Sequence, residues 1–184
     1  MQKRLYITHG YTANSRSHWF PWLKRVLAKH NMLTTIFDMP DSHHPDPRQW
    51  LDYHRKHIEQ CDENTIFVGH SLGCIATLSY LQTQYSNIAG VILVSGFDRT
   101  LPNLPELNPF LNPMPDYADL IERIPYRTVI AAADDPVVNC TYSEQLARHL
   151  QADYQLLASG GHFLDREGCT QLMPVYREVL KILG

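Results

Sequence analysis

The sequence predicts an α/β domain, a three-layer doubly wound sandwich built on about six mostly parallel strands. Short apolar runs alternate with longer amphipathic stretches along the chain, which is typical of strand–helix–strand units around a parallel sheet. The run at residues 91–94 is apolar at every position, as in a central strand that helices cover on both faces. With 184 residues and no internal repeat, the chain fits a single domain, residues 1–184.

The individual elements follow from the spacing of the apolar residues. Strands are expected in the short apolar or β-branched runs, at residues 5–8, 34–37, 65–68, 91–94, 128–131 and 154–157. Helices are expected where apolar side chains recur at helical spacing, at residues 19–30, 47–61, from 74 onward, 142–150 and 173–183. Between residues 40 and 47, three prolines and two histidines indicate an irregular loop.

The segment at residues 101–125 interrupts this alternation, because it carries six prolines and leaves few places for a long helix. It follows the carboxyl end of an expected strand, where open α/β sheets place their ligand crevices. Two interpretations remain open. The segment is either a short lid or wall of a binding pocket, or an ordered surface connection with no further role.

Composition restricts the classes of function. Hydrophobic residues make up 44% and charged residues 19% of the chain, which is typical of a globular protein rather than a disordered one. The formal net charge of -3 and the lack of a long Lys/Arg cluster argue against a nucleic-acid partner. No stretch matches a signal peptide or a membrane span, and the four cysteines lack C-x-x-C spacing. We therefore expect a cytoplasmic protein that does not bind membranes.

A candidate nucleophile lies in Gly69-His70-Ser71-Leu72-Gly73, which matches the G-x-S-x-G pattern between an expected strand and an expected helix. In such a turn the serine adopts a strained conformation that lifts its hydroxyl out of the sheet. Gly69 and Gly73 let the turn pass close to neighbouring backbone. The alternative is a simple strand-to-helix turn whose serine caps the helix. The flanking elements and the partners downstream favour Ser71 as a nucleophile.

The best candidate for a general base among the ten histidines is His162. It follows the last expected strand, and Gly160 and Gly161 allow its loop to fold back over the edge where Ser71 is expected. A serine hydroxyl is a weak nucleophile at neutral pH and requires such a base within hydrogen-bond reach. The alternative is a loop histidine that contacts only water.

Asp135 is the preferred acid, because it follows the strand expected at 128–131 and its turn is stiffened by Pro136. A carboxylate here would fix the tautomer and orientation of the imidazole. The adjacent Asp134 cannot point at the same imidazole and is expected to hold its loop through local backbone hydrogen bonds. Asp98 remains an alternative, since it follows the strand at 91–94 and the order Ser, Asp, His fits both.

The backbone N–H groups of Leu72 and Tyr11 are the expected donors to the oxyanion that forms during acyl transfer. Leu72 directly follows the serine, and Tyr11 belongs to the loop after the first strand. Gly10 is expected to adopt an unusual backbone angle that turns the Tyr11 amide toward Ser71. His9 is expected to brace this loop through hydrogen bonds rather than to take part in the chemistry.

Two further groups of residues have structural interpretations beside functional ones. Trp19, Phe20 and Trp22 are spaced as core residues of a helix, although an apolar pocket would also use them. His43 and His44 lie between acidic residues, but without ligands at fixed spacing elsewhere they indicate a solvated loop. We expect no metal site and no cofactor.

These motifs, together with residues 6–10 and 160–163, resemble the α/β-hydrolase superfamily, and the short length is similar to that of the small serine hydrolases related to retinoblastoma-binding protein 9. The resemblance covers nearly the whole chain. It implies a minimal α/β-hydrolase fold without a separate cap domain, in which Ser71, Asp135 and His162 form a catalytic triad. It does not specify a natural substrate.

The sequence thus predicts a carboxylesterase-like serine hydrolase that cleaves a small carboxylic ester or thioester through an acyl-serine intermediate. An amidase or a lactone hydrolase would use the same residues. An alternative of another class is an α/β-hydrolase-fold module that binds a protein partner and has weak or vestigial esterase activity. The complete set of nucleophile, base and acid favours the enzyme and a small-molecule substrate.

Overall fold

The computed structural model describes residues 2–184, and these contain one sheet of six strands. The strands are β1 (Arg4–Thr8), β2 (Leu33–Ile36), β3 (Thr65–His70), β4 (Gly90–Val94), β5 (Tyr126–Ala132) and β6 (Asp153–Leu157). They are ordered β2-β1-β3-β4-β5-β6, and every neighbouring pair is parallel. β3 and β4 lie in the middle, which confirms the central position expected for residues 91–94.

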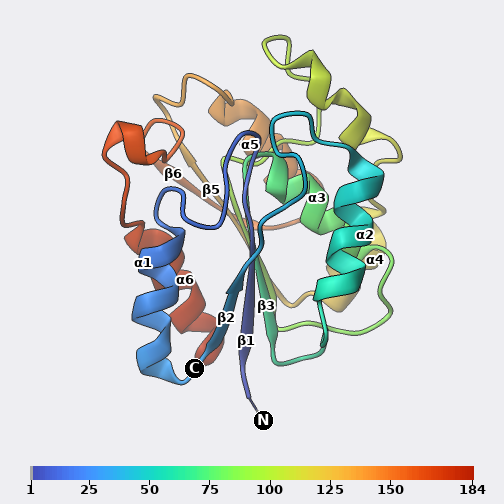
Figure 1. The fold of residues 1–184 in the computed structure, drawn as a ribbon, viewed down its shortest axis with the longest axis vertical. Coiled ribbons are helices and arrows are strands. Elements are labelled where there is room, and N and C mark those ends of the chain that lie inside the picture. Colours follow the sequence, from blue (N-terminus) through green and yellow to red (C-terminus); the bar gives the residue numbers. More distant parts are fainter. Residues whose placement is uncertain (1) are drawn as a thin grey trace.

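Helices cover both faces of this sheet (Figure 1). One face carries α1 (Phe20–Leu27), which continues into η1 (Ala28–His30), and α6 (Met173–Leu183), and the other carries α2 (Pro47–His57), α3 (Leu72–Leu81), α4 (Tyr117–Arg123) and α5 (Cys140–His149). Successive strand residues point to opposite faces, so Ile66 and Val68 join the core under α1 and α6, whereas Phe67 joins the core under α3. The three-layer doubly wound architecture is confirmed.

The limits of the helices show how local signals act. Pro47 starts α2, and the Asp46 carboxylate caps it by accepting a hydrogen bond from the Gln49 N–H at 2.8 Å. The expected end of this helix at residue 61 is wrong. The helix ends at His57 because Ile58 turns to extended angles, φ -91° and ψ 96°, and packs into the core. The last helix, in contrast, spans 173–183 as expected.

The Pro-rich segment at residues 101–125 forms a short 3-10 helix, η2 (Pro105–Leu111), and the seven-residue α4. In Figure 1 the part with η2 rises in yellow-green above α2 and α3 at the carboxyl end of the strands, whereas α4 lies lower, beside α2. Phe110 anchors it on α2, because its ring lies 5.3 Å from the Trp50 ring, centroid to centroid, in an edge-on arrangement. Leu107 is buried beside it. The segment is therefore packed on the domain.

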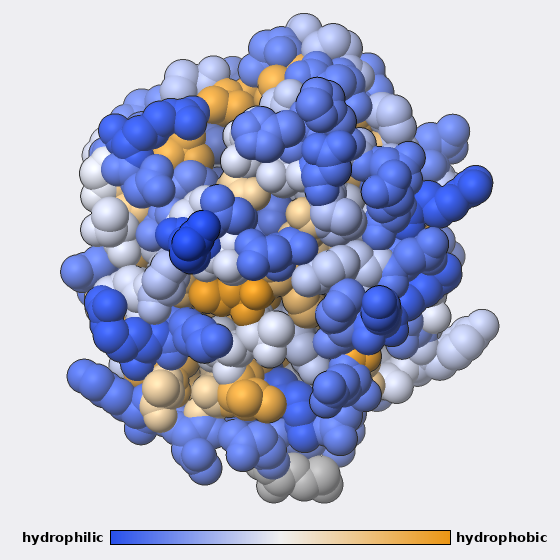
Figure 2. Space-filling model, in the orientation of Figure 1, coloured by the Kyte–Doolittle hydropathy of each residue, from blue (hydrophilic) through white to orange (hydrophobic). Residues whose placement is uncertain are grey.

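The surface carries small apolar patches rather than one broad one on the face that Figure 2 shows, where they are separated by hydrophilic side chains. The exposed large apolar residues come from different elements of the described chain: Leu33, Tyr85, Met114, Tyr126, Leu156 and Met173. Among residues 2–184, no helix combines the length and the apolar character that crossing a membrane requires.

Candidate active site

A cavity of about 450 Å³ opens at the carboxyl edge of the sheet. Ser71 and His162 both line it, although 91 positions separate them in the sequence. Its other lining residues come from the loop after β1, the Pro-rich segment, the Asp135 turn and the chain after β6: Tyr11, Thr12, Ala13, Ser17, His18, Asn103, Leu104, Val137, Leu164, Asp165 and Arg166. The expected meeting of distant loops at one edge is therefore observed.

Ser71 occupies a strained turn between β3 and α3, with φ 52° and ψ -122°. The turn passes so close to β1 that a Cβ atom on Gly73 would lie 2.2 Å from the carbonyl oxygen of Thr8. A Cβ on Gly69 would lie 2.7 Å from Cys74 Cα, so both glycines are required for space. The Ser71 side chain does not cap the helix, and its hydroxyl has no hydrogen-bond partner within residues 2–184. The hydroxyl is thus free on the cavity wall.

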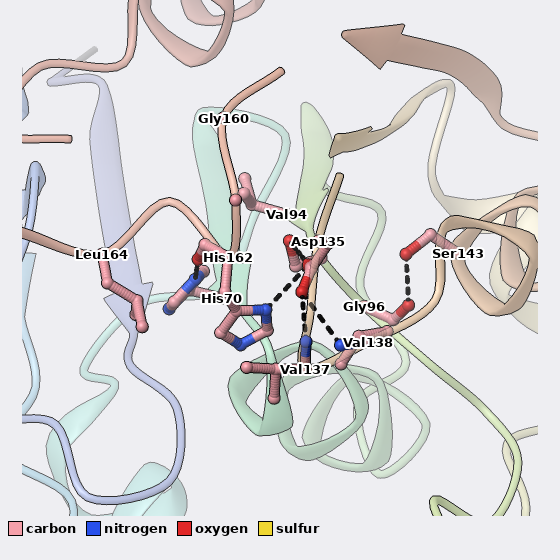
Figure 3. Close-up of polar contacts among 12 residues, drawn as sticks. His70, Val94, Gly96, Asp135, Val137, Val138, Ser143, Gly160, His162 and Leu164 are labelled. Carbon is pink, nitrogen blue, oxygen red and sulfur yellow. Dashed lines mark hydrogen bonds and ion pairs between the residues drawn. The ribbon is translucent and has the colours of Figure 1, made fainter. Parts of the chain in front are cut away.

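His162 and Asp135 form a buried pair, with 2.8 Å between His162 Nδ1 and Asp135 Oδ2 and side chains 5% and 1% exposed (Figure 3). The Ser95 hydroxyl also donates to Oδ2 at 2.9 Å. Oδ1 accepts from the N–H groups of Val137 and Val138, at 2.8 and 3.0 Å. Four donors therefore fix this carboxylate. This pair occupies Nδ1, whereas Nε2 of His162 has no hydrogen-bond partner within residues 2–184.

The two other aspartates considered from the sequence have different partners. Asp98 Oδ2 lies 2.6 Å from His149 Nδ1 and accepts a hydrogen bond from the Tyr117 hydroxyl at 2.8 Å. It does not contact His162. Asp134 Oδ1 accepts hydrogen bonds from the N–H groups of Gly160 and Gly161, both at 2.9 Å. Asp134 therefore holds a loop, as expected, but the loop is that of His162 rather than its own.

The loop after β1 approaches Ser71 closely. The expectation that Gly10 adopts an unusual backbone angle is wrong, since its φ lies outside the left-handed region. Glycine is needed here for space, because a Cβ would lie 2.9 Å from Ser71 Cβ. His9 braces the loop as expected: its Nδ1–H donates to the Gly10 carbonyl at 2.8 Å, and its Nε2 accepts from the Met39 N–H at 2.9 Å.

The amides expected to bind an oxyanion carry no other bond. Within the described part of the chain, neither the Tyr11 N–H nor the Leu72 N–H donates to a protein acceptor. Leu72 is the first residue of α3, where helical N–H groups lack an internal partner. Both amides are therefore unoccupied by other groups of the described chain.

His70 packs against His162, and His18 packs against His70 in turn. The His70 ring lies 5.1 Å from the His162 ring and 5.4 Å from the His18 ring, centroid to centroid. Burial, together with the nearby charge of His162, holds the pKa of His70 well below its usual value, and burial also lowers the pKa of His18. The Nε2–H of His70 donates to the His162 carbonyl oxygen at 2.9 Å. His70 thus fixes the backbone that carries His162.

Glu167 also holds this backbone, and sequence reasoning missed it. Its Oε2 accepts hydrogen bonds from the His162 N–H at 2.8 Å and from the Leu164 N–H at 3.1 Å. No sequence signal pointed to it, because Leu164 rather than Ser or Thr stands three residues before this glutamate, at the start of a helical turn. That turn is η3 (Asp165–Glu167). The cavity residues Asn103 and Arg166 were also missed, since exposed loop positions carry no periodic pattern.

The other groups considered from the sequence lie elsewhere. Trp19, Phe20 and Trp22 are buried in the core under α1 and α6, and none of them lines the cavity, so the core interpretation is confirmed. His44 is on a solvated loop with its side chain 86% exposed. Within residues 2–184, no three His, Cys, Asp or Glu side chains are grouped closely enough to hold a metal ion.

Comparison with known proteins places these features in a family. Residues 5–181 match the model of the family described as serine hydrolase. The chain is 41% identical over 178 residues to YdeN of Bacillus subtilis, covering 96% of this chain and 94% of YdeN. It is 25% identical over 162 residues to the rat serine hydrolase RBBP9, covering 87% and 81%.

Solved structures show the same architecture. The crystal structure of the ydeN gene product from B. subtilis superposes with a TM-score of 0.96 at 39% identity, covering 99% of each chain. Mouse alpha/beta hydrolase domain-containing protein 10 gives a TM-score of 0.73 at 12% identity, covering 98% of this chain and 89% of that one, which is a likeness of fold alone. The chain has the α/β-hydrolase fold.

Proposed function

Since the chain belongs to the serine hydrolase family, we propose that it hydrolyses a small carboxylic ester or thioester through an acyl intermediate on Ser71. One observation carries the proposal. A serine with a free hydroxyl and a histidine whose far nitrogen is bound to a buried carboxylate line the same cavity. In this proposal Ser71 is the nucleophile, His162 the general base and Asp135 the residue that orients the base.

The reaction follows from this arrangement. Asp135 holds a proton on His162 Nδ1, so Nε2 can accept the proton of the Ser71 hydroxyl as its oxygen attacks the substrate carbonyl. Such serine–histidine hydrogen bonds are often long without substrate and shorten in its presence. His162 then returns the proton to the leaving alcohol or thiol, and a water molecule, activated in the same way, releases the acid.

The oxyanion requires donors that are fixed before the reaction begins. The N–H groups of Leu72 and Tyr11 fit this role, because both lack a protein acceptor, Leu72 directly follows the nucleophile and Tyr11 lines the same cavity. The positive end of the α3 dipole supports Leu72. Each such donor contributes on the order of 3 kcal/mol to stabilising the transition state.

The size of the cavity supports a small substrate. A volume of about 450 Å³ lies in the range of small-molecule sites. Leu104 and Val137 offer apolar contact, whereas His18, Asn103 and Arg166 make the remaining wall polar. We therefore propose a compact acyl group, short enough to leave these polar groups in contact with the substrate or with water.

The replacement of Ser71 by alanine tests the proposal. Wild-type protein is expected to hydrolyse p-nitrophenyl butyrate and to be labelled by a fluorophosphonate on Ser71, as mass spectrometry of the digest would show. Ser71→Ala should lose at least a thousandfold in kcat, since the nucleophile is removed. Ser86→Ala, at an exposed serine outside the cavity, is the matched control.

Two results would contradict the proposal. Turnover by Ser71→Ala at the wild-type rate would exclude Ser71 as the nucleophile. Folded wild-type protein that neither hydrolyses esters nor reacts with the probe would favour a binding module, especially if it captures the same protein partner with and without Ser71→Ala.

A further inference from the structure

The chain between β6 and η3, residues 158–164, is here called the base loop because it carries His162. Its backbone follows an unusual path: Gly161 and Phe163 are both left-handed at φ 56°, and Gly160 has φ 158°. Phe163 is not a glycine, so this conformation carries strain and persists only where neighbouring groups enforce it. The structure therefore needs groups that hold the base loop from outside.

Side chains supply that restraint on both sides of His162. Glu167 accepts the His162 N–H at 2.8 Å, and His70 donates to the His162 carbonyl at 2.9 Å. In a loop, such backbone groups usually pair with water or with other backbone. Here both peptide groups that flank the His162 side chain are bonded to side chains, which restricts rotation of the Cα–Cβ vector.

The carboxylate of Glu167 lies within the curve of the base loop. A Cβ atom on Gly161 would lie 2.7 Å from the Glu167 carboxyl carbon, so glycine makes room for the carboxylate. The same Oε2 also bonds the Leu164 N–H at 3.1 Å. One oxygen thus links the backbone of His162 to that of Leu164, the residue before η3. The carboxylate therefore spans the strained part of the chain.

We propose that Glu167 is a positioning residue for His162, which fixes the base-loop backbone so that Nε2 of the imidazole faces Ser71. The inference rests on the proposed function, since it assigns Glu167 a role through the base. Asp134 assists from the other side by accepting the N–H groups of Gly160 and Gly161. The role requires an oxygen acceptor of the right length, not a titrating group.

Physical reasoning gives the size of the effect. A base must be held within a fraction of an ångström, and a shift of about 1 Å can cost about a hundredfold in rate. Removal of Glu167 frees two N–H groups, which water can satisfy without holding the loop. We therefore expect a loss of about tenfold in kcat with little change in KM, because the substrate contacts remain.

The experiment compares Glu167→Ala with Glu167→Gln. Glutamine keeps an oxygen at the same distance from the backbone, so Glu167→Gln should retain kcat within about threefold while Glu167→Ala loses about tenfold. KM for p-nitrophenyl butyrate should stay within about twofold in both. The rate constant of fluorophosphonate labelling should fall in parallel with kcat, since it also depends on the base. Glu144→Ala is the control, because Glu144 is paired with Arg148 on α5 and does not line the cavity.

Several outcomes would overturn the inference. Glu167→Ala with wild-type kcat and labelling rate would show that the base does not depend on Glu167, even if the melting temperature fell. Glu167→Gln as impaired as Glu167→Ala would exclude the role of an acceptor oxygen. Wild-type protein without turnover or labelling would contradict both the proposed function and this inference. Active wild-type protein with unaffected variants would contradict only the inference.

Discussion

The base loop and the Pro-rich segment at residues 101–125 both border the cavity, but they are held in different ways. Asp134, Glu167 and His70 bond the backbone of the base loop at four N–H groups and one carbonyl. Where the Pro-rich segment reaches the cavity, Asn103 Nδ2 donates an exposed hydrogen bond to the Val137 carbonyl at 3.1 Å, and the Glu106 carboxylate interacts with the Tyr11 hydroxyl.

This difference matches what each region must do. A general base transfers protons only from a narrow range of positions, so its support must be rigid. A pocket wall only has to fill space beside the acyl group, and the packing of Phe110 and Leu107 some residues away is sufficient to hold it. The comparison implies that equal perturbations of the two regions have unequal effects on catalysis.

Among the tests of this comparison, the largest effect is expected from Asp134→Ala, measured against Asn103→Ala. Both residues are exposed, and each change removes one side chain that hydrogen-bonds to backbone. Asp134 accepts a hydrogen bond from a backbone N–H group, and Asn103 donates one to a backbone carbonyl. Asp134→Ala should lower kcat about tenfold to a hundredfold, because Gly160 and Gly161 lose their acceptor. Asn103→Ala should change kcat less than threefold. Steady-state kinetics with p-nitrophenyl butyrate measure both.

Asp134→Asn is the control for this pair, since its amide oxygen can accept the same two bonds and should restore most of kcat. Equal losses in Asp134→Ala and Asn103→Ala would contradict the distinction between a rigid and a tolerant region.

A second effect concerns stability at acid pH and again involves the support of the base loop. The buried His70 has a pKa well below its usual value, so the unfolded chain binds a proton at this position more readily than the folded chain does. The contribution of His70 to the free energy of unfolding is therefore fully present above about pH 6.5. It is lost as the pH falls toward the pKa that His70 has in the folded protein. By pH 5 the free energy of unfolding should fall by up to about 2 kcal/mol.

Thermal unfolding at pH 7.5 and pH 5 measures the total decrease, of which His70 is expected to contribute about 5 °C in Tm. His70→Gln should show a smaller decrease, because glutamine can still donate to the His162 carbonyl but does not titrate. The other buried histidines, His54 with a pKa of about 3 and His9 with a lowered pKa, should produce the remaining decrease in both proteins. An identical pH dependence in the variant would exclude His70 as a source.

The sequence was sufficient for the six strands and for α1, α2, α3, α5 and α6, because each depends on apolar periodicity within a few turns, but it did not predict η2 and α4 in the Pro-rich segment. It also led to Ser71, His162 and Asp135, which the structure brings to one edge, since strand ends in a parallel sheet share an edge. It was less informative about side-chain support. Glu167 bonds across a strained loop, and such contacts depend on φ values that no local pattern specifies.

Two expectations from the sequence were wrong for the same reason. The reason given for Gly10 was a backbone angle, whereas the structure shows a steric requirement set by Ser71, a residue distant in sequence. The end of α2 was placed four residues late, because helical propensity continues past His57 while tertiary packing draws Ile58 into the core. In both cases a contact made by a distant residue decided the local conformation.

The smallest effect is expected within the tolerant region itself. Leu104 contributes an apolar surface to the cavity, so Leu104→Ala should change substrate preference rather than the chemical step. We expect KM for a longer acyl ester, p-nitrophenyl octanoate, to change about two- to threefold relative to the acetate, with kcat on the acetate nearly unchanged. Met114→Ala, in the same segment but outside the cavity, is the matched control. A fall in kcat as large as that of Asp134→Ala would show that the Pro-rich segment positions the catalytic groups too, and the contrast between the two regions would not hold.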